Sequence, residues 1–162
     1  MKTIDIYCDG SCRNKKTQRD GGWGAIIVHG FYPLNPTIMC GVAANATSNN
    51  RMELLAAICP LEILGAHDVP VVVTSDSKYV VDGFRFWIKD WEGNDWKVSN
   101  GDDLKNMDLW KRLLLQKRAH RNLTFKWVKG HRGHAFNEQA DYWAGLARRG
   151  TVPDEYIVSS DS

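Results

Sequence analysis

Four acidic residues in this chain stand in local settings that suit metal chemistry. Asp9 and Asp76 end apolar, strand-like runs, whereas Glu53 and Asp141 lie early on helix-like runs. Carboxylates among apolar neighbours repel one another and lose hydration energy, so gathering them is useful mainly for holding hard divalent cations. Two such cations about 4 Å apart stabilise both oxygens of a phosphoryl displacement. The set therefore indicates metal-dependent phosphoryl chemistry, although each acid alone also suits a turn, a helix cap or a solvated helix face.

Hydrophobic patterning predicts the elements that must position these acids. Strands are expected at 3–9, 23–29, 37–45, 69–75 and 123–128, and helices at 48–65, 77–92, 103–119 and 137–149. This order predicts an α/β fold with a mixed five-stranded sheet flanked by helices, in which strands 1–3 are antiparallel and strands 4–5 are parallel additions. Asn50 and Glu53 have capping-box spacing, and Pro60 predicts a kink or break in its helix.

Length and composition describe an ordinary globular chain. It has 162 residues, of which 43% are hydrophobic and 25% charged, and we expect one domain over 1–150 followed by a flexible tail over 151–162. No apolar run approaches the roughly 20 residues of a membrane span. No signal peptide is visible and the four cysteines lack zinc-type pairing, so we expect a cytoplasmic protein with free thiols.

Positive charge is unevenly distributed along the chain. The stretch from Leu109 to Asn137 contains no Asp or Glu, and it carries Lys111, Arg112, Lys117, Arg118, Arg121, Lys126, Lys129 and Arg132. A second cluster comprises Arg13, Lys15, Lys16 and Arg19. One-sided positive charge favours a polyanionic partner. A solvated helix face is the alternative interpretation for part of the longer stretch.

Four motifs resemble those of ribonuclease H type 1, of the bacterial stand-alone kind. They are DGSC, NNRMEL, TSDSKYV and KGHRGHAFNEQAD, they occur in the family's order, and the resemblance runs from about Thr3 to Arg148. It implies a ribonuclease H-like fold and an endonuclease that hydrolyses the RNA strand of RNA–DNA hybrids with little sequence specificity. It also implies a two-metal-ion mechanism with Mg²⁺, for which Mn²⁺ substitutes, giving 5′-phosphate and 3′-hydroxyl ends. A monomer without an obligate protein partner is expected.

The resemblance also implies roles for individual residues. Asp9, Glu53, Asp76 and Asp141 would be the metal ligands, with Asp9 bridging both ions. Glu53 and Asp76 would hold the ion facing the leaving oxygen, and Asp141 the ion that activates water. His131, between glycine-containing pairs, would assist proton transfer or product departure.

Substrate binding is predicted for three segments, the first of them from its basic charge and the other two from the resemblance. Their residues are Asn14, Lys15 and Lys16; Ser48, Asn49 and Asn50; and Trp87 and Lys97. For Asn49 and Asn50 the alternative is helix capping, and for Trp87 it is the core. Two segments depart from the family: the loop after DGSC reads RNKKTQRD, and the 84–105 segment, a basic handle in the family, has four basic and five acidic residues.

Two other functions are compatible with this broad fold. A non-catalytic hybrid-binding module is disfavoured by the complete acid set, since carboxylates repel phosphate. A junction-cutting or integrase-like nuclease is disfavoured by NNRMEL and KGHRGH.

Overall fold

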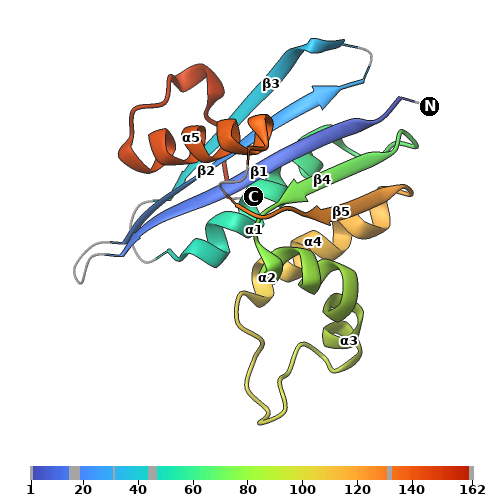
Figure 1. Ribbon diagram of the computed structural model, residues 1–162. Helices are drawn as coiled ribbons and strands as arrows, with labels where there is room; N and C mark the ends of the chain where they lie inside the picture. The colour runs from blue at the N-terminus through green and yellow to red at the C-terminus, as the bar shows by residue number, and fades with distance from the viewer. Residues whose placement is uncertain (1, 15–18, 31, 44–46, 131–132, 161–162) are drawn as a thin grey trace.

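The computed structural model describes residues 2–14, 19–30, 32–43, 47–130 and 133–160. Five strands form one sheet in the order β3-β2-β1-β4-β5 (Figure 1). They are β1 (Ile4–Asn14), β2 (Arg19–His29), β3 (Tyr32–Ala43), β4 (Val71–Ser75) and β5 (Leu123–Trp127). The first three pair antiparallel, whereas β4 pairs parallel with both β1 and β5. The predicted mixed sheet is therefore confirmed.

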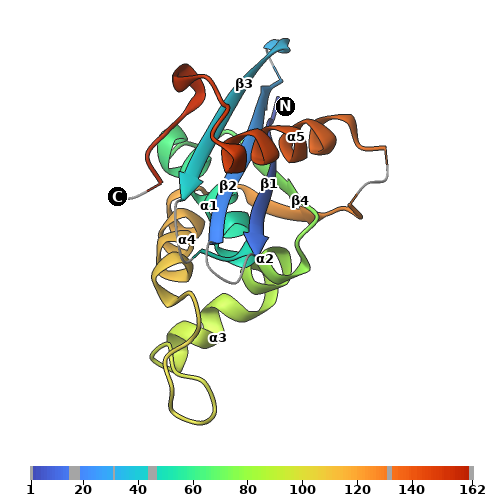
Figure 2. The same cartoon turned by 90° about the vertical axis from the view of Figure 1, so that its left-hand side faces the viewer.

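Helices cover both faces of this sheet (Figures 1 and 2). They are α1 (Asn49–Leu64), α2 (Lys78–Asp82), the π-helical turn η1 (Gly83–Trp87), α3 (Ile88–Gly93), α4 (Met107–Ala119) and α5 (Ala135–Arg149), followed by the 3₁₀ turn η2 (Asp154–Tyr156). Alternation along the strands divides the core. Ile6 and Cys8 join the cluster that contains α1 and α4, whereas Tyr7 packs with the cluster beneath α5.

Helix α1 differs from its prediction at two points. Its N-cap is Ser48, whose Oγ accepts a hydrogen bond from Arg51 N at 3.2 Å, so the capping box predicted for Asn50 and Glu53 is wrong. The helix also continues through Pro60, so a break there is wrong, whereas the alternative of a kink stays a prediction. Pro60 lies within a continuous buried run, and burial of that run outweighs the roughly 3 kcal/mol cost of an internal proline.

Other elements also begin or end at residues different from those predicted. The first hairpin is longer than predicted because the β1–β2 ladder continues from Asp9↔Gly24 to Asn14↔Arg19. The helix predicted for 77–92 is confirmed as an uninterrupted helical stretch over 78–93, with the π-helical turn η1 inside it. Helix α4 begins at Met107, not at Asp103, because Asn106 adopts a left-handed conformation with φ of 61° and Asp103 bridges to Lys97.

The segment after α5 lies along the edge of the domain. Val158 N donates at 2.9 Å to the carbonyl oxygen of Cys40, a residue of the edge strand β3. Ser160 Oγ accepts from Trp23 Nε1 at 2.9 Å, and its carbonyl accepts from Arg112 at 3.0 Å. The described part of the tail thus makes specific contacts with the sheet and with α4. The flexibility of 151–162 and the domain boundary at 150 stay predictions.

None of the four cysteines, all of which are described, forms a disulfide, as predicted. Across the described ranges, no helix has the length and apolar character that a membrane crossing requires.

Glycine allows α5 to lie directly on β2. A Cβ built on Gly24 would come within 2.8 Å of Ala140 O and Ala144 N, closer than real Cβ atoms approach such groups. Gly24 is also the cross-strand partner of Asp9. The same contact therefore sets the height of α5 above the sheet at the level of that acid.

We expect Gly24→Ala to lower the free energy of unfolding by roughly 1–3 kcal/mol, because the added methyl group must push α5 away. Urea unfolding measures the change. Gly145→Ala, inside α5, is the matched control: its Cβ would meet only the Arg149 guanidinium, at 3.2 Å, and helix propensity favours Ala by up to about 1 kcal/mol. Equal stability of the Gly24 variant and the wild type would contradict the packing argument.

Candidate active site

The register of the parallel strands brings Asp9 and Asp76 together. Strands β1 and β4 pair in parallel from Ile4↔Val71 to Tyr7↔Thr74. Asp9 and Asp76 each follow the last of these pairs by two residues, so both stand just beyond the point where the parallel pairing ends, although β1 itself continues to Asn14. The ends of parallel strands are a common place for sites in α/β folds.

Helix α1 brings Glu53 to the same place through a close backbone approach. A Cβ on Gly10 would come within 2.5 Å of Glu53 N and 2.6 Å of Met52 C. Gly10 N donates to Asp9 Oδ1 at 3.0 Å, and the backbone of Gly10 also hydrogen-bonds to the Glu53 carboxylate. The glycine of the DGSC motif therefore lets strand and helix meet, a role the sequence analysis did not assign.

Three carboxylates form the centre of the site. One oxygen from each of Asp9, Glu53 and Asp76 lies within 4.8 Å of the others. Burial, and then the charge of Glu53, raises the pKa of Asp9 far above its ordinary value. Burial and the charge of Asp76 likewise raise the pKa of Glu53. The mutual repulsion is the electrostatic condition that a divalent cation relieves.

The donor set fits a hard cation. All three ligands are carboxylates, and Glu53 Oε2 is buried with no hydrogen-bond partner among the described residues. A buried acceptor left without a donor is costly in a native fold unless another ligand satisfies it. Asp9, Glu53 and Asp76 are therefore the residues that would hold a metal.

Asp141 lies at the edge of this cluster. It is exposed on α5 and lies outside the three-carboxylate group, but its side chain hydrogen-bonds to Asp9. It also lines the same cavity of about 350 Å³ as the three other acids. The structure thus brings all four predicted acids together, three tightly and one from the opposite face of the sheet.

The start of α1 forms the adjoining wall of the cavity. Asn49 and Asn50 line it together with Ser11 and Cys12, and both asparagine residues are exposed. Because Ser48 provides the cap, neither amide is required for capping. The predicted substrate contacts of Ser48, Asn49 and Asn50 remain predictions, but Asn49 and Asn50 line the same cavity as Glu53.

A second set of contacts supports Asp76 from β5 and the loop after it. Trp127 Nε1 donates to Asp76 O at 3.0 Å, and Lys78 Nζ lies 4.8 Å from the centre of the Trp127 ring. A Cβ on Gly130 would meet Asp76 Oδ2 at 2.8 Å. Sequence reasoning gave no role to Trp127 or Gly130. His131, the side chain of Asn14, Lys15 and Lys16 lie outside the described residues, so their assignments stay predictions.

The 84–105 segment divides its tryptophans between core and surface. Trp96 is buried and Trp91 packs edge-on against Trp110, whereas Trp87 is 52% exposed. Lys97 forms an ion pair with Asp103. Trp87 therefore remains available to a ligand, and the charge of Lys97 is partly neutralised.

The acid-free stretch is less positive at its surface than its sequence indicates. Arg112 pairs with Glu62 and Arg118 pairs with Glu92, both at 2.6 Å. Lys117 donates to Phe84 O. Acids elsewhere in the chain thus neutralise two arginines of this stretch, Arg112 and Arg118, and the sequence did not show which acids these are.

Comparisons with known proteins agree with this geometry. A family model for RNase H matches residues 1–149. A protein named ribonuclease H from Ruthia magnifica subsp. Calyptogena magnifica is 42% identical over 147 residues, which is 91% of this chain and 96% of that protein. The chain belongs to the RNase H family. This family is metal-dependent, and the carboxylate cluster is the part of the fold that would bind a metal.

Two solved structures share the fold. LC9-RNase H1, described as a type 1 RNase H with the type 2 active-site motif, superimposes with a TM-score of 0.80 at 30% identity, covering 94% of this chain and 74% of the other. LC11-RNase H1 in complex with an RNA/DNA hybrid gives a TM-score of 0.67 at 22% identity, covering 93% of this chain and 100% of the other.

We expect Asp9→Asn to stabilise the protein when divalent cations are absent. An acid whose pKa is raised by folding favours the folded state while it is protonated. Folding stability is therefore lost as the pH rises above 3.8, the ordinary pKa of an aspartate. Asn removes that loss, and the gain near pH 7.5 should be roughly 1–3 kcal/mol.

Urea unfolding in chelator at pH 4 and pH 7.5 measures this effect. The advantage of Asp9→Asn should grow with pH and shrink when Mg²⁺ is added, because only the wild-type site gains a ligand. Asp5→Asn, on the same strand and outside the cluster, is the control. A variant less stable than the wild type at pH 7.5 in chelator would show that repulsion does not dominate this site.

Proposed function

We propose that this protein is an endoribonuclease that hydrolyses the RNA strand of RNA–DNA hybrids, using two Mg²⁺ ions and leaving 5′-phosphate and 3′-hydroxyl ends. The observation that carries the proposal is the cluster of Asp9, Glu53 and Asp76 within 4.8 Å, with Asp141 on the same cavity. Membership of the RNase H family and a fold shared with a hybrid-bound protein support the substrate class.

The bound ions supply Lewis-acid stabilisation of the phosphate and a water of lowered pKa. The protein provides the carboxylates that hold them. Asp9 has side-chain hydrogen bonds to both Glu53 and Asp141, so it is the acid that would contribute to holding both ions. Glu53 and Asp76 form the inner group, and Asp141 approaches from α5. His131 is proposed to assist proton transfer or product departure.

Recognition of the RNA strand is assigned to the wall formed by the start of α1. A hybrid presents 2′-hydroxyls in a wide, shallow minor groove. Asn49 and Asn50 are exposed beside Glu53, where amides can exchange hydrogen bonds with such hydroxyls. Ser48 and Asn14 complete the proposed contacts. Groove shape and 2′-hydroxyls carry little base information, so low sequence specificity follows.

Location and assembly complete the proposal. We assign the protein to the cytoplasm and to a monomeric state. The acids and the groove-facing amides all come from one chain, so the site needs no contribution from a second copy.

The activity is tested by incubating the protein with labelled RNA–DNA hybrid, double-stranded DNA and single-stranded RNA, each with Mg²⁺ and with chelator. We expect cleavage of the RNA strand of the hybrid alone, and only with metal. Tight hybrid binding without cleavage in Mg²⁺ or Mn²⁺ would identify a non-catalytic binding module instead. Cleavage of DNA would point to a different metal nuclease.

Asp9→Asn should reduce hybrid cleavage by more than about 10³-fold, beyond the usual cost of one lost electrostatic contact. Its hybrid affinity in Ca²⁺ should stay within about threefold of the wild type, because the groove contacts remain. Asp5→Asn again serves as the control. Cleavage by Asp9→Asn near the wild-type rate would remove Asp9 from the metal site.

The source of the electrostatic grip is a separate prediction. With Lys97 paired to Asp103, we expect the 13–19 cluster to contribute more than the 84–105 segment. Replacing Lys15, Lys16 and Arg19 by Gln should raise the Michaelis constant and lower the salt slope of binding by up to about 0.9 per lost phosphate contact.

The matched variant replaces Lys89, Lys97 and Lys105 by Gln, which removes the same number of charges from the 84–105 segment. Hybrid affinity is measured for both variants across a range of salt concentrations. A larger loss from the 84–105 variant would reverse the assignment of the grip.

A further inference from the structure

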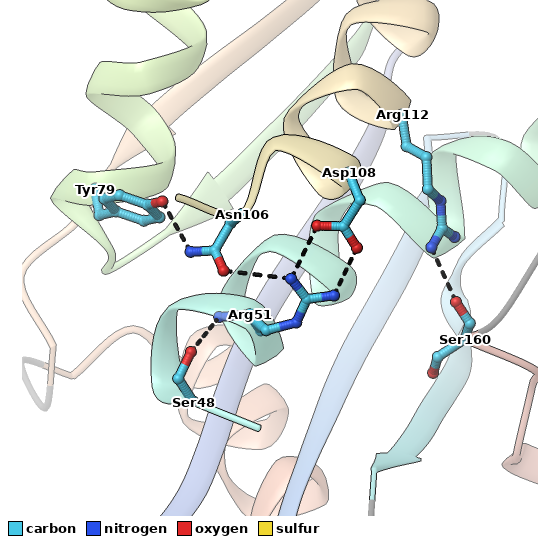
Figure 3. Close-up of polar contacts among 7 residues, drawn as sticks. All are labelled: Ser48, Arg51, Tyr79, Asn106, Asp108, Arg112 and Ser160. Atoms are coloured by element: carbon cyan, nitrogen blue, oxygen red, sulfur yellow. Dashed lines mark hydrogen bonds and ion pairs between the residues drawn. The ribbon is translucent and has the colours of Figure 1, made fainter. Parts of the chain in front are cut away.

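A polar network joins the first turn of α1 to the start of α4 (Figure 3). Arg51 donates to both carboxylate oxygens of Asp108, from Nη1 at 2.9 Å and from Nη2 at 2.7 Å. Arg51 Nη1 also donates to Asn106 Oδ1 at 3.3 Å. The backbone N of the same arginine donates to the N-cap Ser48. The Arg51 side chain therefore holds the first turn of α1 against α4, while the backbone N of the same residue completes the helix cap.

The network continues to α2. Asn106 Nδ2 donates to the Tyr79 hydroxyl at 3.0 Å, and Trp110 Nε1 donates to the same oxygen at 3.0 Å. Tyr79 lies three residues after Asp76, and Arg51 lies two residues before Glu53. The hydrogen bonds thus connect the two segments that carry these acids, through one residue at the start of α4.

The backbone of Asn106 indicates that this geometry is maintained at a cost. Its φ of 61° is left-handed, a conformation that costs most residues about 1–2 kcal/mol and that Asn tolerates better. In this conformation its amide bonds to Arg51 on one side and Tyr79 on the other. Arg51 itself is only partly exposed, at 32% of its side chain.

We propose that Arg51, through Asp108 and Asn106, is a positioning residue that sets Glu53 relative to Asp76 for metal binding. This rests on the proposed metal site. The Arg51 guanidinium hydrogen-bonds to Asp108 and Asn106, so Arg51 would act by fixing the helix turn that carries Glu53. Groups that orient metal ligands commonly change metal affinity about 10–100-fold when lost.

A second ion pair between the same helices provides the comparison. Arg112 on α4 donates to Glu62 on α1 at 3.1 and 2.6 Å. It is also bidentate, but it lies toward the far end of α1, away from Glu53. Losing it should cost comparable stability, about 1 kcal/mol or less for a partly exposed pair, without moving the acids.

The test measures Mn²⁺ binding to the full-length protein by calorimetry, which needs no catalytic turnover. Arg51→Met, which keeps length and helix propensity, should bind Mn²⁺ about 10-fold more weakly than wild type. Arg51→Lys should recover part of the loss, since one ammonium cannot replace both guanidinium bonds. Arg112→Met should remain within about twofold of wild type.

Unfolding and hybrid-binding measurements distinguish the outcomes. If Arg51→Met does not fold, Asp108→Asn replaces it, with Glu62→Gln as its control. Equal Mn²⁺ affinity in the near and far variants would overturn the inference, as would loss of hybrid affinity in chelator with Mn²⁺ binding unchanged, which would make Arg51 a phosphate contact. Failure of the wild type to bind Mn²⁺ or cleave hybrids would instead reject the proposed function.

Discussion

The repulsion among Asp9, Glu53 and Asp76 is the constraint on which the rest of this structure depends. Their oxygens lie within 4.8 Å, and Asp9 is only 5% exposed, so neither distance nor water relieves their charge. Folding energy from elsewhere must hold them until a cation binds. The large core cluster shared by the sheet, α1 and α4 supplies that energy. A site of this kind should become less stable, not more, when its metal is removed at neutral pH.

Close backbone contacts between the sheet and its helices fix the positions of the acids. Gly10 lets β1 touch the first turn of α1, and Gly24 lets α5 lie on β2 beside Asp9. Register performs the same task for Asp76, which stands level with Asp9 at the end of the parallel pair. Each acid is therefore placed by main-chain packing, and its side chain needs little freedom to reach the cluster.

Sequence patterns predicted those features that depend on local periodicity. The β-branched run before Asp76 required a buried strand, and the alternation before Asp9 required another, so both acids were expected at strand ends. Features that depend on competition between tertiary contacts could not be predicted from the sequence. Ser48 replaced Asn50 as the cap, packing carried α1 through Pro60, and the left-handed Asn106 started α4 later than expected. The proximity of Asp141 to Asp9 depends on the sheet, and only the family resemblance indicated it.

Three arginines and three lysines in the described parts of this protein make different kinds of contact. Arg51, Arg112 and Arg118 each make paired hydrogen bonds to a carboxylate on another helix, where the planar guanidinium fixes orientation. Lys78 instead lies over Trp127 beside Asp76, and Lys126 and Lys129 are exposed. A compact ammonium on a flexible stem suits phosphates whose positions vary with the substrate. The acid-free stretch therefore contains two kinds of cation, and its arginines at 112 and 118 brace the helices while its exposed lysines remain available to a polyanion.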